Sequence, residues 1–246
     1  MSGGGSDGTL GLEGRAAVVT GATRGLGLAI ARKLCGCGVD VVLDYRTDEA
    51  AAEAAVASLA GLKGRAVAVR QDVRRPDAVA VLLGEARQRF GRVDVLVHNA
   101  SAFSPVPTRE ASVHALRRDL TTALNPLLAG APALAELLPA GGRVVAVSSS
   151  GTDRVVPGYL SQGLAKAALE TLVRYLALDL GEQGVTVNAV STAKLHKGEG
   201  PAPRLGARQL TRPEQVADAV ALLCTDEADW IRGQVLTVDG GWNLQP

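Results

Sequence analysis

Two side chains suited to acid–base chemistry lie seven positions apart in one helical segment. Tyr159 offers a phenol and Lys166 an ammonium group, within the stretch Tyr-Leu-Ser-Gln-Gly-Leu-Ala-Lys. Seven residues make nearly two helical turns, so both side chains lie on the same face. The charge of the lysine would lower the pKa of a nearby phenol. This arrangement predicts a proton donor; a tyrosine that only packs at the helix start is the alternative.

A glycine-rich turn near the start of the chain is suited to binding phosphate groups. It reads Thr-Gly-Ala-Thr-Arg-Gly-Leu-Gly over residues 20–27, after an apolar segment and before a helical one. Glycines allow a tight turn and let the backbone approach a pyrophosphate held at a helix N-terminus. Packing of a strand against a helix would also explain them. The position of the turn, between the first strand and the first helix, favours a nucleotide.

These residues must be positioned by strands and helices that alternate along the chain. Apolar, β-branched segments predict strands at 16–20, 39–44, 66–70, 93–98, 143–148, 186–190 and 234–238. Helical patterns lie near 25–36, 48–60, 76–90, 112–138, 159–181 and 213–224. This alternation indicates an α/β fold with a doubly wound parallel sheet of about seven strands and helices on both faces. The capping-box pattern Thr211-Arg-Pro-Glu214 predicts the start of the last helix.

Length, charge and apolar patterning exclude several classes of protein. The chain has 246 residues and a net charge of +1, so we expect one α/β domain and no nucleic-acid partner. It contains no apolar run as long as a membrane span and no signal-peptide core, so we expect a cytoplasmic protein without a membrane partner. Three cysteines without a CxxC pair and three scattered histidines argue against a disulfide framework and a metal site.

Two segments are expected to lie outside the packed core. Residues 1–10 are rich in glycine and serine and predict a flexible tail, which leaves 11–246 as a single domain. Residues 191–210 contain several glycines and prolines and are too polar for the core. A loop of this length is more often a lid or binding loop than a random insertion. We therefore expect a substrate loop near 191–210.

The order of motifs from about Leu12 onward resembles the short-chain dehydrogenase/reductase family. The shared motifs are the glycine turn, Asp72-Val73, Asn99-Ala100, Val147-Ser148-Ser149, Lys166, Val187-Asn188-Ala189-Val190 and Val238-Asp239-Gly240-Gly241. The resemblance implies a single-domain, Rossmann-like oxidoreductase that uses a nicotinamide cofactor. It places this cofactor against Gly21, Thr23, Arg24, Gly25, Leu26, Gly27, Tyr45, Arg46, Asp72, Val73, Asn99, Ala100, Lys166 and Thr192. One departure is Ser101, which replaces the glycine that follows Asn-Ala in the family.

The end of the second strand bears on the choice between NADPH and NADH. An acidic side chain there would accept hydrogen bonds from the adenosine ribose, whereas cations would pair with the 2′-phosphate of NADPH. In the register that we prefer, Tyr45 occupies the acidic position, Arg46 follows it and Arg24 lies in the glycine turn. Two arginines suit a dianionic phosphate, so NADPH is the expected cofactor. A register shifted by one residue would place Asp44 at the ribose and favour NADH.

The catalytic set of the family's ketone reductases is only half present. Ser149 and Lys166 match it. Gln162 stands at the tyrosine position, four residues before the lysine, and cannot act as a general acid. The asparagine that the family carries on its fourth helix is also absent, because Thr121 aligns with it, or Asp119 if the register shifts.

The Tyr-x6-Lys spacing resembles instead the bacterial enoyl-acyl-carrier-protein reductases, and above all their NADPH-dependent branch. A displacement of three residues moves the phenol about 4.5 Å along the helix axis. In 2-enoyl thioester reduction, hydride reaches the β-carbon while negative charge develops on a carbonyl oxygen several ångströms away, so a displaced donor suits this reaction. The resemblance assigns Tyr159 to the enolate oxygen and Lys166 to the cofactor, with Ser149 as the third catalytic residue.

We therefore expect an NADPH-dependent reductase of an acyl thioester, with reduction of a 2-enoyl carbon–carbon bond as the leading reaction. A 3-oxoacyl or polyketide ketoreductase with a relocated tyrosine is one alternative, and a catalytically silent nucleotide-binding scaffold is another. The thioester would be carried by acyl-carrier protein or coenzyme A, in fatty-acid or polyketide biosynthesis. Lys194, Lys197 and Arg204 are candidates for contacts with the phosphates of the carrier. The resemblance also implies a homotetramer.

Overall fold

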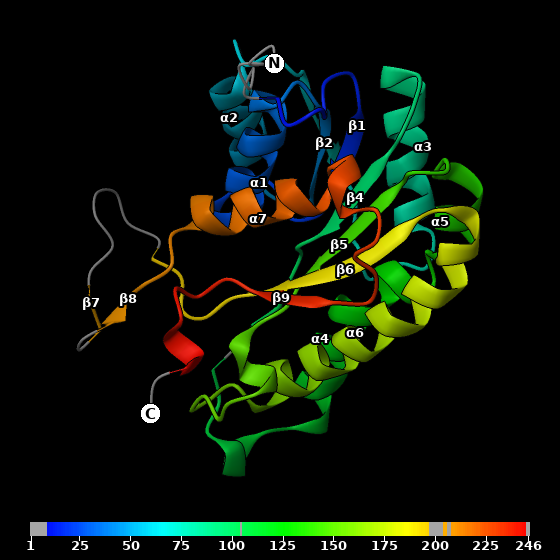
Figure 1. Ribbon diagram of the computed structural model, residues 1–246. Coiled ribbons are helices and arrows are strands. Elements are labelled where there is room, and N and C mark those ends of the chain that lie inside the picture. Colours follow the sequence, from blue (N-terminus) through cyan, green and yellow to red (C-terminus); the bar gives the residue numbers. More distant parts are fainter. Residues whose placement is uncertain (1–8, 104, 197–203, 206–207, 245–246) are drawn as a thin grey trace, which may run out of the picture.

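Seven parallel strands form one twisted sheet through the middle of the molecule (Figure 1). The structure is a computed structural model that describes residues 9–103, 105–196, 204–205 and 208–244. The strands are β1 (Ala16–Val19), β2 (Asp40–Tyr45), β3 (Ala66–Arg70), β4 (Val95–His98), β5 (Arg143–Val147), β6 (Thr186–Ser191) and β9 (Val235–Thr237). Their order in the sheet is β3-β2-β1-β4-β5-β6-β9, and every neighbouring pair is parallel. The predicted doubly wound sheet is confirmed.

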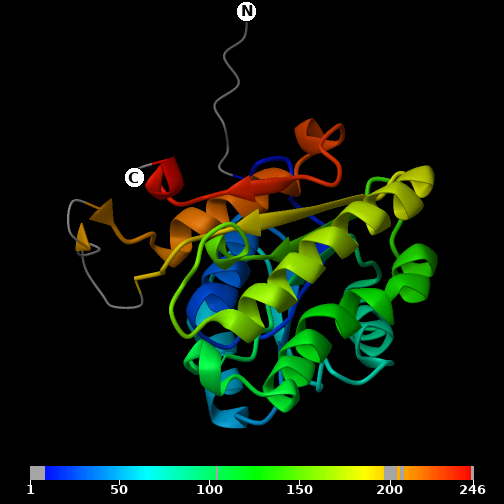
Figure 2. The same cartoon turned by 90° about the horizontal axis from the view of Figure 1, so that it is seen from below.

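Helices cover both faces of this sheet (Figure 2). One face carries α1 (Gly25–Gly36), α2 (Glu49–Leu59) and α7 (Pro213–Leu223). The other carries α3 (Ala78–Phe90), α4 (Val113–Leu128), α5 (Ala131–Leu137) and α6 (Leu160–Asp179). Successive strand residues enter opposite cores, as Val18 and Val19 do, so the strands are apolar on both sides. None of the described helices is long and apolar enough to cross a membrane.

The helix predicted at 112–138 is two helices in the structure. The first ends at Leu128, and the second begins at Ala131. Gly130 lies between them, where an added Cβ would come within 2.2 Å of the Pro126 carbonyl oxygen and 2.8 Å of the Val79 Cβ. The single-helix prediction was therefore wrong, because Pro132 in the first turn of α5 has no N–H to continue the hydrogen bonds of α4.

The last helix begins where the sequence predicts, but its cap lies one residue later. The Arg212 backbone N–H donates to Gln215 Oε1 at 2.9 Å. Thr211 lies just outside the helix and instead forms an isolated parallel bridge with Leu195. The predicted pairing of Thr211 with Glu214 was therefore wrong, although the helix start at Pro213 was right.

Only part of the predicted substrate loop is described. Lys194 is exposed, and the short antiparallel strands β7 (Arg204–Leu205) and β8 (Arg208–Gln209) form a hairpin that the sequence pattern did not predict. Lys197, the side chain of Arg204 and residues 1–8 of the predicted tail lie outside what the structure describes. The predictions of a lid and of a flexible tail therefore stay predictions.

The strand order fixes where a ligand can bind. The chain passes from β1 to β2 on one side, and later returns to β4 on the other side of β1. The loops that follow β1 and β4 therefore diverge at the carboxyl edge of the sheet, which is where open α/β sheets hold their ligands. The glycine turn and Asn99 lie on these two loops.

Candidate active site

The glycine turn after β1 leaves its backbone open to a ligand. Gly21 and Gly25 have φ values of +61° and +54°, which favour glycine, and nothing lies within 4 Å of a Cβ built on Gly25. A Cβ on Gly27 would lie 2.3 Å from the Gly21 carbonyl oxygen, so this glycine lets α1 pack against the turn. Arg24, the N-cap residue of α1, makes no side-chain capping bond. The free N–H groups of the first helical turn therefore fit an anion such as a pyrophosphate.

The segment after β4 holds the turn in place. Asn99 Nδ2 donates to the carbonyl oxygens of Thr20 (3.0 Å) and Gly21 (3.1 Å). Thr20 Oγ1 in return accepts from the backbone N–H groups of Asn99 and Ala100, both at 3.0 Å. The predicted residues of the two loops thus lie together. Thr23 and Leu26 lie in the same turn, half-buried, with Leu26 packed against the core.

The structure shows which residue at the end of β2 is free to meet a ribose. Asp44 is buried, and its Oδ2 accepts from the Gly21 backbone N–H at 3.0 Å. Burial raises the pKa of this carboxyl to about 7. Because Asp44 is turned toward the glycine turn, the register that places it at the ribose is disfavoured. Tyr45 is half-buried and Arg46 exposed, and Arg24 is exposed in the turn, as the NADPH register requires.

The remaining predicted cofactor residues lie at the same edge of the sheet. Asp72 follows β3 and pairs with the Arg74 guanidinium, which holds the pKa of the carboxyl at about 2. Val73 beside it is buried. Thr192 follows β6, and its buried Oγ1 has no hydrogen-bond partner within the described part of the chain. A buried hydroxyl without a partner is costly, so Thr192 fits a residue that bonds to a ligand.

Lys166, in α6, is almost fully buried. Its side chain is 3% exposed, and Nζ donates to the Val147 carbonyl oxygen at 2.6 Å. Burial lowers the pKa of the ammonium group to about 8, against the charge of Glu170, which raises it. Ser148 Oγ donates to Glu170 Oε1 and fixes this carboxylate. One N–H of Lys166 is thus committed to the protein, and two remain for ligands.

Tyr159 stands at the N-terminus of α6 and faces Ser149. Burial raises the pKa of the phenol, and a hydrogen bond with Ser149 lowers it. The ring packs against Phe103 with centroids 5.0 Å apart and planes at 54°. A Cβ on Gly151 would lie 2.5 Å from two ring carbons of Tyr159. Gly151 therefore leaves the space that the Tyr159 ring occupies, a role that no local pattern in the sequence indicates.

Gln162 and Ser101, the two departures from the family pattern, contact each other. Gln162 is buried one turn after Tyr159, and its Nε2 donates to Ser101 Oγ. Gln162, at the position where the ketone-reducing members of the family carry their tyrosine, is thus hydrogen-bonded to the loop after β4. Sequence reasoning found both positions but not the contact, because residues 61 apart give no local pattern.

On α4, Asp119 and not Thr121 faces the catalytic residues. Asp119 is 1% exposed and accepts from Ser161 Oγ at 2.9 Å, and its charge raises the pKa of Tyr159. Thr121 Oγ1 instead donates to the Arg117 carbonyl oxygen of its own helix. The alternative register of the sequence alignment is therefore the one that the structure supports. No group of three potential ligands that could hold a metal occurs among the described residues.

Fold, glycine turn and the Ser149, Tyr159 and Lys166 cluster together define a class of protein. Residues 21–243 match the family described as enoyl-(acyl carrier protein) reductase. The chain belongs to the short-chain dehydrogenase/reductase family, and the predicted family and its oxidoreductase class are confirmed.

Three similar proteins span nearly the whole chain. The 1-cyclohexenylcarbonyl-CoA reductase of Streptomyces collinus is 35% identical, with 92% of this chain and 86% of the relative covered. The cis-4-hydroxycyclohexanecarboxylate dehydrogenase of Sinomonas cyclohexanicum is 39% identical, with 93% and 96% covered. A solved short-chain dehydrogenase from Burkholderia cenocepacia in complex with NADP is 33% identical, with a TM-score of 0.86 and 95% and 99% covered.

Proposed function

We propose that this chain is an NADPH-dependent reductase of 2-enoyl thioesters. The observation that carries the proposal is the position of Tyr159. Its hydroxyl forms a hydrogen bond with Ser149, and Tyr159 is the N-cap residue of the helix that carries buried Lys166, while Gln162 fills the position one turn closer to the lysine. In 2-enoyl thioester reduction, the carbonyl oxygen is not on the carbon that receives the hydride. A phenol displaced by one turn suits such an oxygen. The relative named as a cyclohexenylcarbonyl-CoA reductase supports the same class of substrate.

The residues divide the chemistry as follows. The glycine turn, Asn99 and Lys166 would hold NADPH, which would supply a hydride to the β-carbon, and the double-bond electrons would then move to the thioester carbonyl oxygen. Tyr159 donates a hydrogen bond to that oxygen, where the enolate charge develops. Ser149 orients the phenol, and Lys166 holds the ribose and supplies positive charge near it. Water then delivers a proton to the α-carbon, which completes the reduction without an asparagine on α4.

NADP(H) is the cofactor that the site fits. Arg24 and Arg46 are both exposed at the edge where the ribose would lie, and Asp44 is committed to Gly21. Two guanidinium groups can pair with a 2′-phosphate, which NADH lacks. The neighbour from Burkholderia cenocepacia, solved in complex with NADP, agrees with this assignment.

Arg46→Ala should weaken NADPH binding by roughly 10- to 150-fold and leave NADH binding nearly unchanged, because a charge-assisted contact contributes about 1.5–3 kcal/mol. Fluorescence titration of each reduced cofactor measures both affinities. Arg89→Ala, which removes an arginine from the far end of α3, is the matched control and should change neither. Equal losses for both cofactors would show that Arg46 does not contact the phosphate.

Ketone reduction by the displaced tyrosine is the second candidate. The Ser149–Tyr159 hydrogen bond favours it, since a serine and a tyrosine together could also bind a ketone oxygen. The relative named as a hydroxycyclohexanecarboxylate dehydrogenase acts at a carbon that bears oxygen.

Gln162→Tyr separates the two candidates by restoring the four-residue spacing to Lys166. If Gln162 excludes ketones, the variant should gain about ten-fold or more in kcat/KM on an acetoacetyl thioester. Gln162→Phe fills the same space without an acid and should not gain. A wild-type enzyme that already reduces the acetoacetyl thioester faster than either variant would favour the ketoreductase.

Oxidation of NADPH with crotonyl-CoA and with acetoacetyl-CoA tests the proposed function. We expect turnover with the crotonyl thioester and little with the acetoacetyl thioester. The reverse preference would establish the ketoreductase. Tight NADPH binding without turnover of either thioester would support the catalytically silent scaffold.

A further inference from the structure

His98, the last residue of β4, is a buried histidine that the proposed reaction does not use. Its side chain is 0% exposed. One ring nitrogen, Nδ1, lies 3.1 Å from Thr20 Oγ1, just after β1. The other, Nε2, lies 3.1 Å from the Ala123 carbonyl oxygen in α4. The imidazole therefore joins the start of the glycine turn to α4.

The surroundings of His98 decide which ring nitrogen carries a proton. Burial lowers the pKa of the imidazole to about 3, and the charge of Lys166 acts in the same direction, so the ring is neutral. A neutral imidazole has one N–H donor and one acceptor nitrogen. The Ala123 carbonyl oxygen can only accept, so the proton lies on Nε2. Nδ1 is then the acceptor, and the Thr20 hydroxyl donates to it.

The Thr20 hydroxyl is fully used in this arrangement. It donates its hydrogen to His98, and its two lone pairs accept from the backbone N–H groups of Asn99 and Ala100, both at 3.0 Å. A hydroxyl hydrogen rotates to any acceptor that is offered. Because His98 supplies that acceptor, it directs both lone pairs of Thr20 toward the loop after β4.

This loop in turn shapes the glycine turn. The Asn99 side chain donates to the carbonyl oxygens of Thr20 and Gly21. A Cβ on Gly27 would lie 2.6 Å from Asn99 Nδ2, so the amide of Asn99 fits closely between the turn and the start of α1. A shift of Asn99 would therefore displace the backbone groups that face a pyrophosphate.

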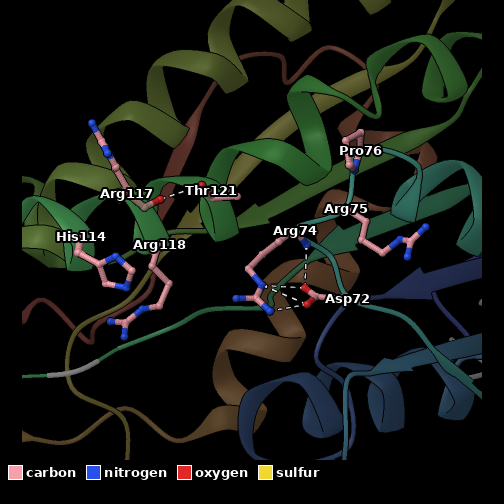
Figure 3. A pocket seen from close by; sticks show the side chains of 8 residues that line it. All are labelled: Asp72, Arg74, Arg75, Pro76, His114, Arg117, Arg118 and Thr121. Carbon is pink, nitrogen blue, oxygen red and sulfur yellow. Dashed lines mark hydrogen bonds and ion pairs between the residues drawn. The ribbon is translucent and has the colours of Figure 1, made fainter.

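The part of α4 that supports His98 is held by a second hydrogen bond. Asn125, two residues after Ala123, donates from Nδ2 to the Arg74 carbonyl oxygen at 2.9 Å. Figure 3 shows Arg74, paired with Asp72, in the segment that faces α4. The glycine turn and the Asp72 segment, two parts of the cofactor site, are therefore tied to the same turn of α4.

We propose that His98 is a positioning residue for the cofactor. Through Thr20 and the loop after β4, it holds the glycine turn in the conformation that binds the pyrophosphate of NADP(H). Because its side chain is fully buried, His98 acts through Thr20 and not by contact with the cofactor. The role concerns cofactor binding alone, so it is the same whichever substrate is reduced.

Two variants separate the two hydrogen bonds of His98. The amide of an asparagine lies where Nδ1 lies in a histidine, whereas the amide of a glutamine reaches as far as Nε2. His98→Asn therefore keeps an acceptor for Thr20, and His98→Gln keeps only the donor to Ala123. Each variant loses one buried hydrogen bond, so both should lower the unfolding temperature to a similar extent. Only His98→Gln should raise the Kd of NADPH, by about ten-fold, while His98→Asn stays within about two-fold of wild type.

Fluorescence titration gives the Kd of NADPH, and thermal unfolding gives the stability. Thr225→Val is the matched control, because it removes one hydroxyl bond, to the Leu222 carbonyl oxygen, at the opposite edge of the sheet, where Arg143 begins β5. It should lower the unfolding temperature and leave the Kd unchanged. Equal Kd values for His98→Asn and His98→Gln would show that His98 only stabilises the fold, which would overturn the proposal.

Thr20→Val tests the same hydrogen bond from its other end. Valine keeps the shape of threonine without the hydroxyl, so the Kd of NADPH should rise at least as much as in His98→Gln. Both substitutions act through one bond, so the double variant should bind NADPH no more weakly than Thr20→Val alone. Additive losses, or an unchanged Kd in Thr20→Val, would contradict the proposed role.

The position of the proton can be observed in the wild type, even if a His98 variant does not fold. Long-range ¹H–¹⁵N NMR spectra of ¹⁵N-labelled protein distinguish a protonated from a bare ring nitrogen. At neutral pH, His98 should carry its proton on Nε2 and have a bare Nδ1. A proton on Nδ1 would reverse the Thr20 hydrogen bond and overturn the proposal.

Discussion

Tyr159→Phe lowers kcat on a 2-enoyl thioester by about 100-fold or more, while folding and NADPH binding are retained. The substitution removes only the hydroxyl, so the ring keeps its contacts with Phe103 and Gly151. Loss of one pre-organised donor at a developing oxyanion costs about 10²–10³ in rate. Steady-state kinetics give kcat, thermal unfolding reports folding, and fluorescence titration gives the affinity for NADPH.

Tyr175→Phe is the matched control for this prediction. Tyr175 lies on the same helix but is 73% exposed and far along it from the active site. Its loss of a hydroxyl should leave kcat unchanged. If kcat is unchanged in Tyr159→Phe as well, the phenol does not act in the reaction, and the silent scaffold or a role for Ser149 becomes the better account.

Lys166→Met should lower kcat/KM by about 100-fold, because the substitution removes a positive charge from the proposed cofactor site and a donor to the ribose. In the wild type, the protonated amine is needed and its pKa lies near 8, so kcat/KM should fall as the pH rises above about 8. A pH–rate profile between pH 6 and 10 measures this decline. A flat profile would contradict the role of the charged lysine.

The pH dependence of protein stability also reports on the pKa of Lys166. Burial lowers the pKa of Lys166 from its ordinary value of 10.5 to about 8. Between these values the unfolded chain binds more protons than the folded one, so this group makes the protein more stable as the pH rises from about 8 to 10.5. Urea unfolding of wild type and Lys166→Met across this range should show a rise that the variant lacks. Parallel curves would show that the amine is not buried as described.

The sequence predicted the fold because its strands carry a strong local signal. β1, β4, β5 and β6 are buried on both faces and read as nearly unbroken apolar runs, which only a covered parallel sheet explains. The break near Gly130 was missed although Gly130 and Pro132 together are a local signal for the end of one helix and the start of the next. Close approach of α3 to Gly130 is a tertiary effect.

The candidate site was only partly predictable for the same reason. Lys166 lies in α6 as predicted, but Tyr159 is the N-cap residue of this helix with φ −109° and ψ 9°, so helical spacing alone does not give the position of the phenol. The space that Gly151 provides for the phenol and the contact of Gln162 with Ser101 depend on loops that converge only in the folded chain.

Transfer of deuterium from NADPH labelled at both C4 positions of the nicotinamide identifies the carbon that receives the hydride. With a crotonyl thioester, we expect a butyryl thioester that carries one deuterium at the β-carbon, identified by NMR and mass spectrometry. Unchanged crotonyl thioester, together with deuterium on the carbinol carbon of a 3-hydroxybutyryl thioester formed from the acetoacetyl substrate, would contradict the proposed function.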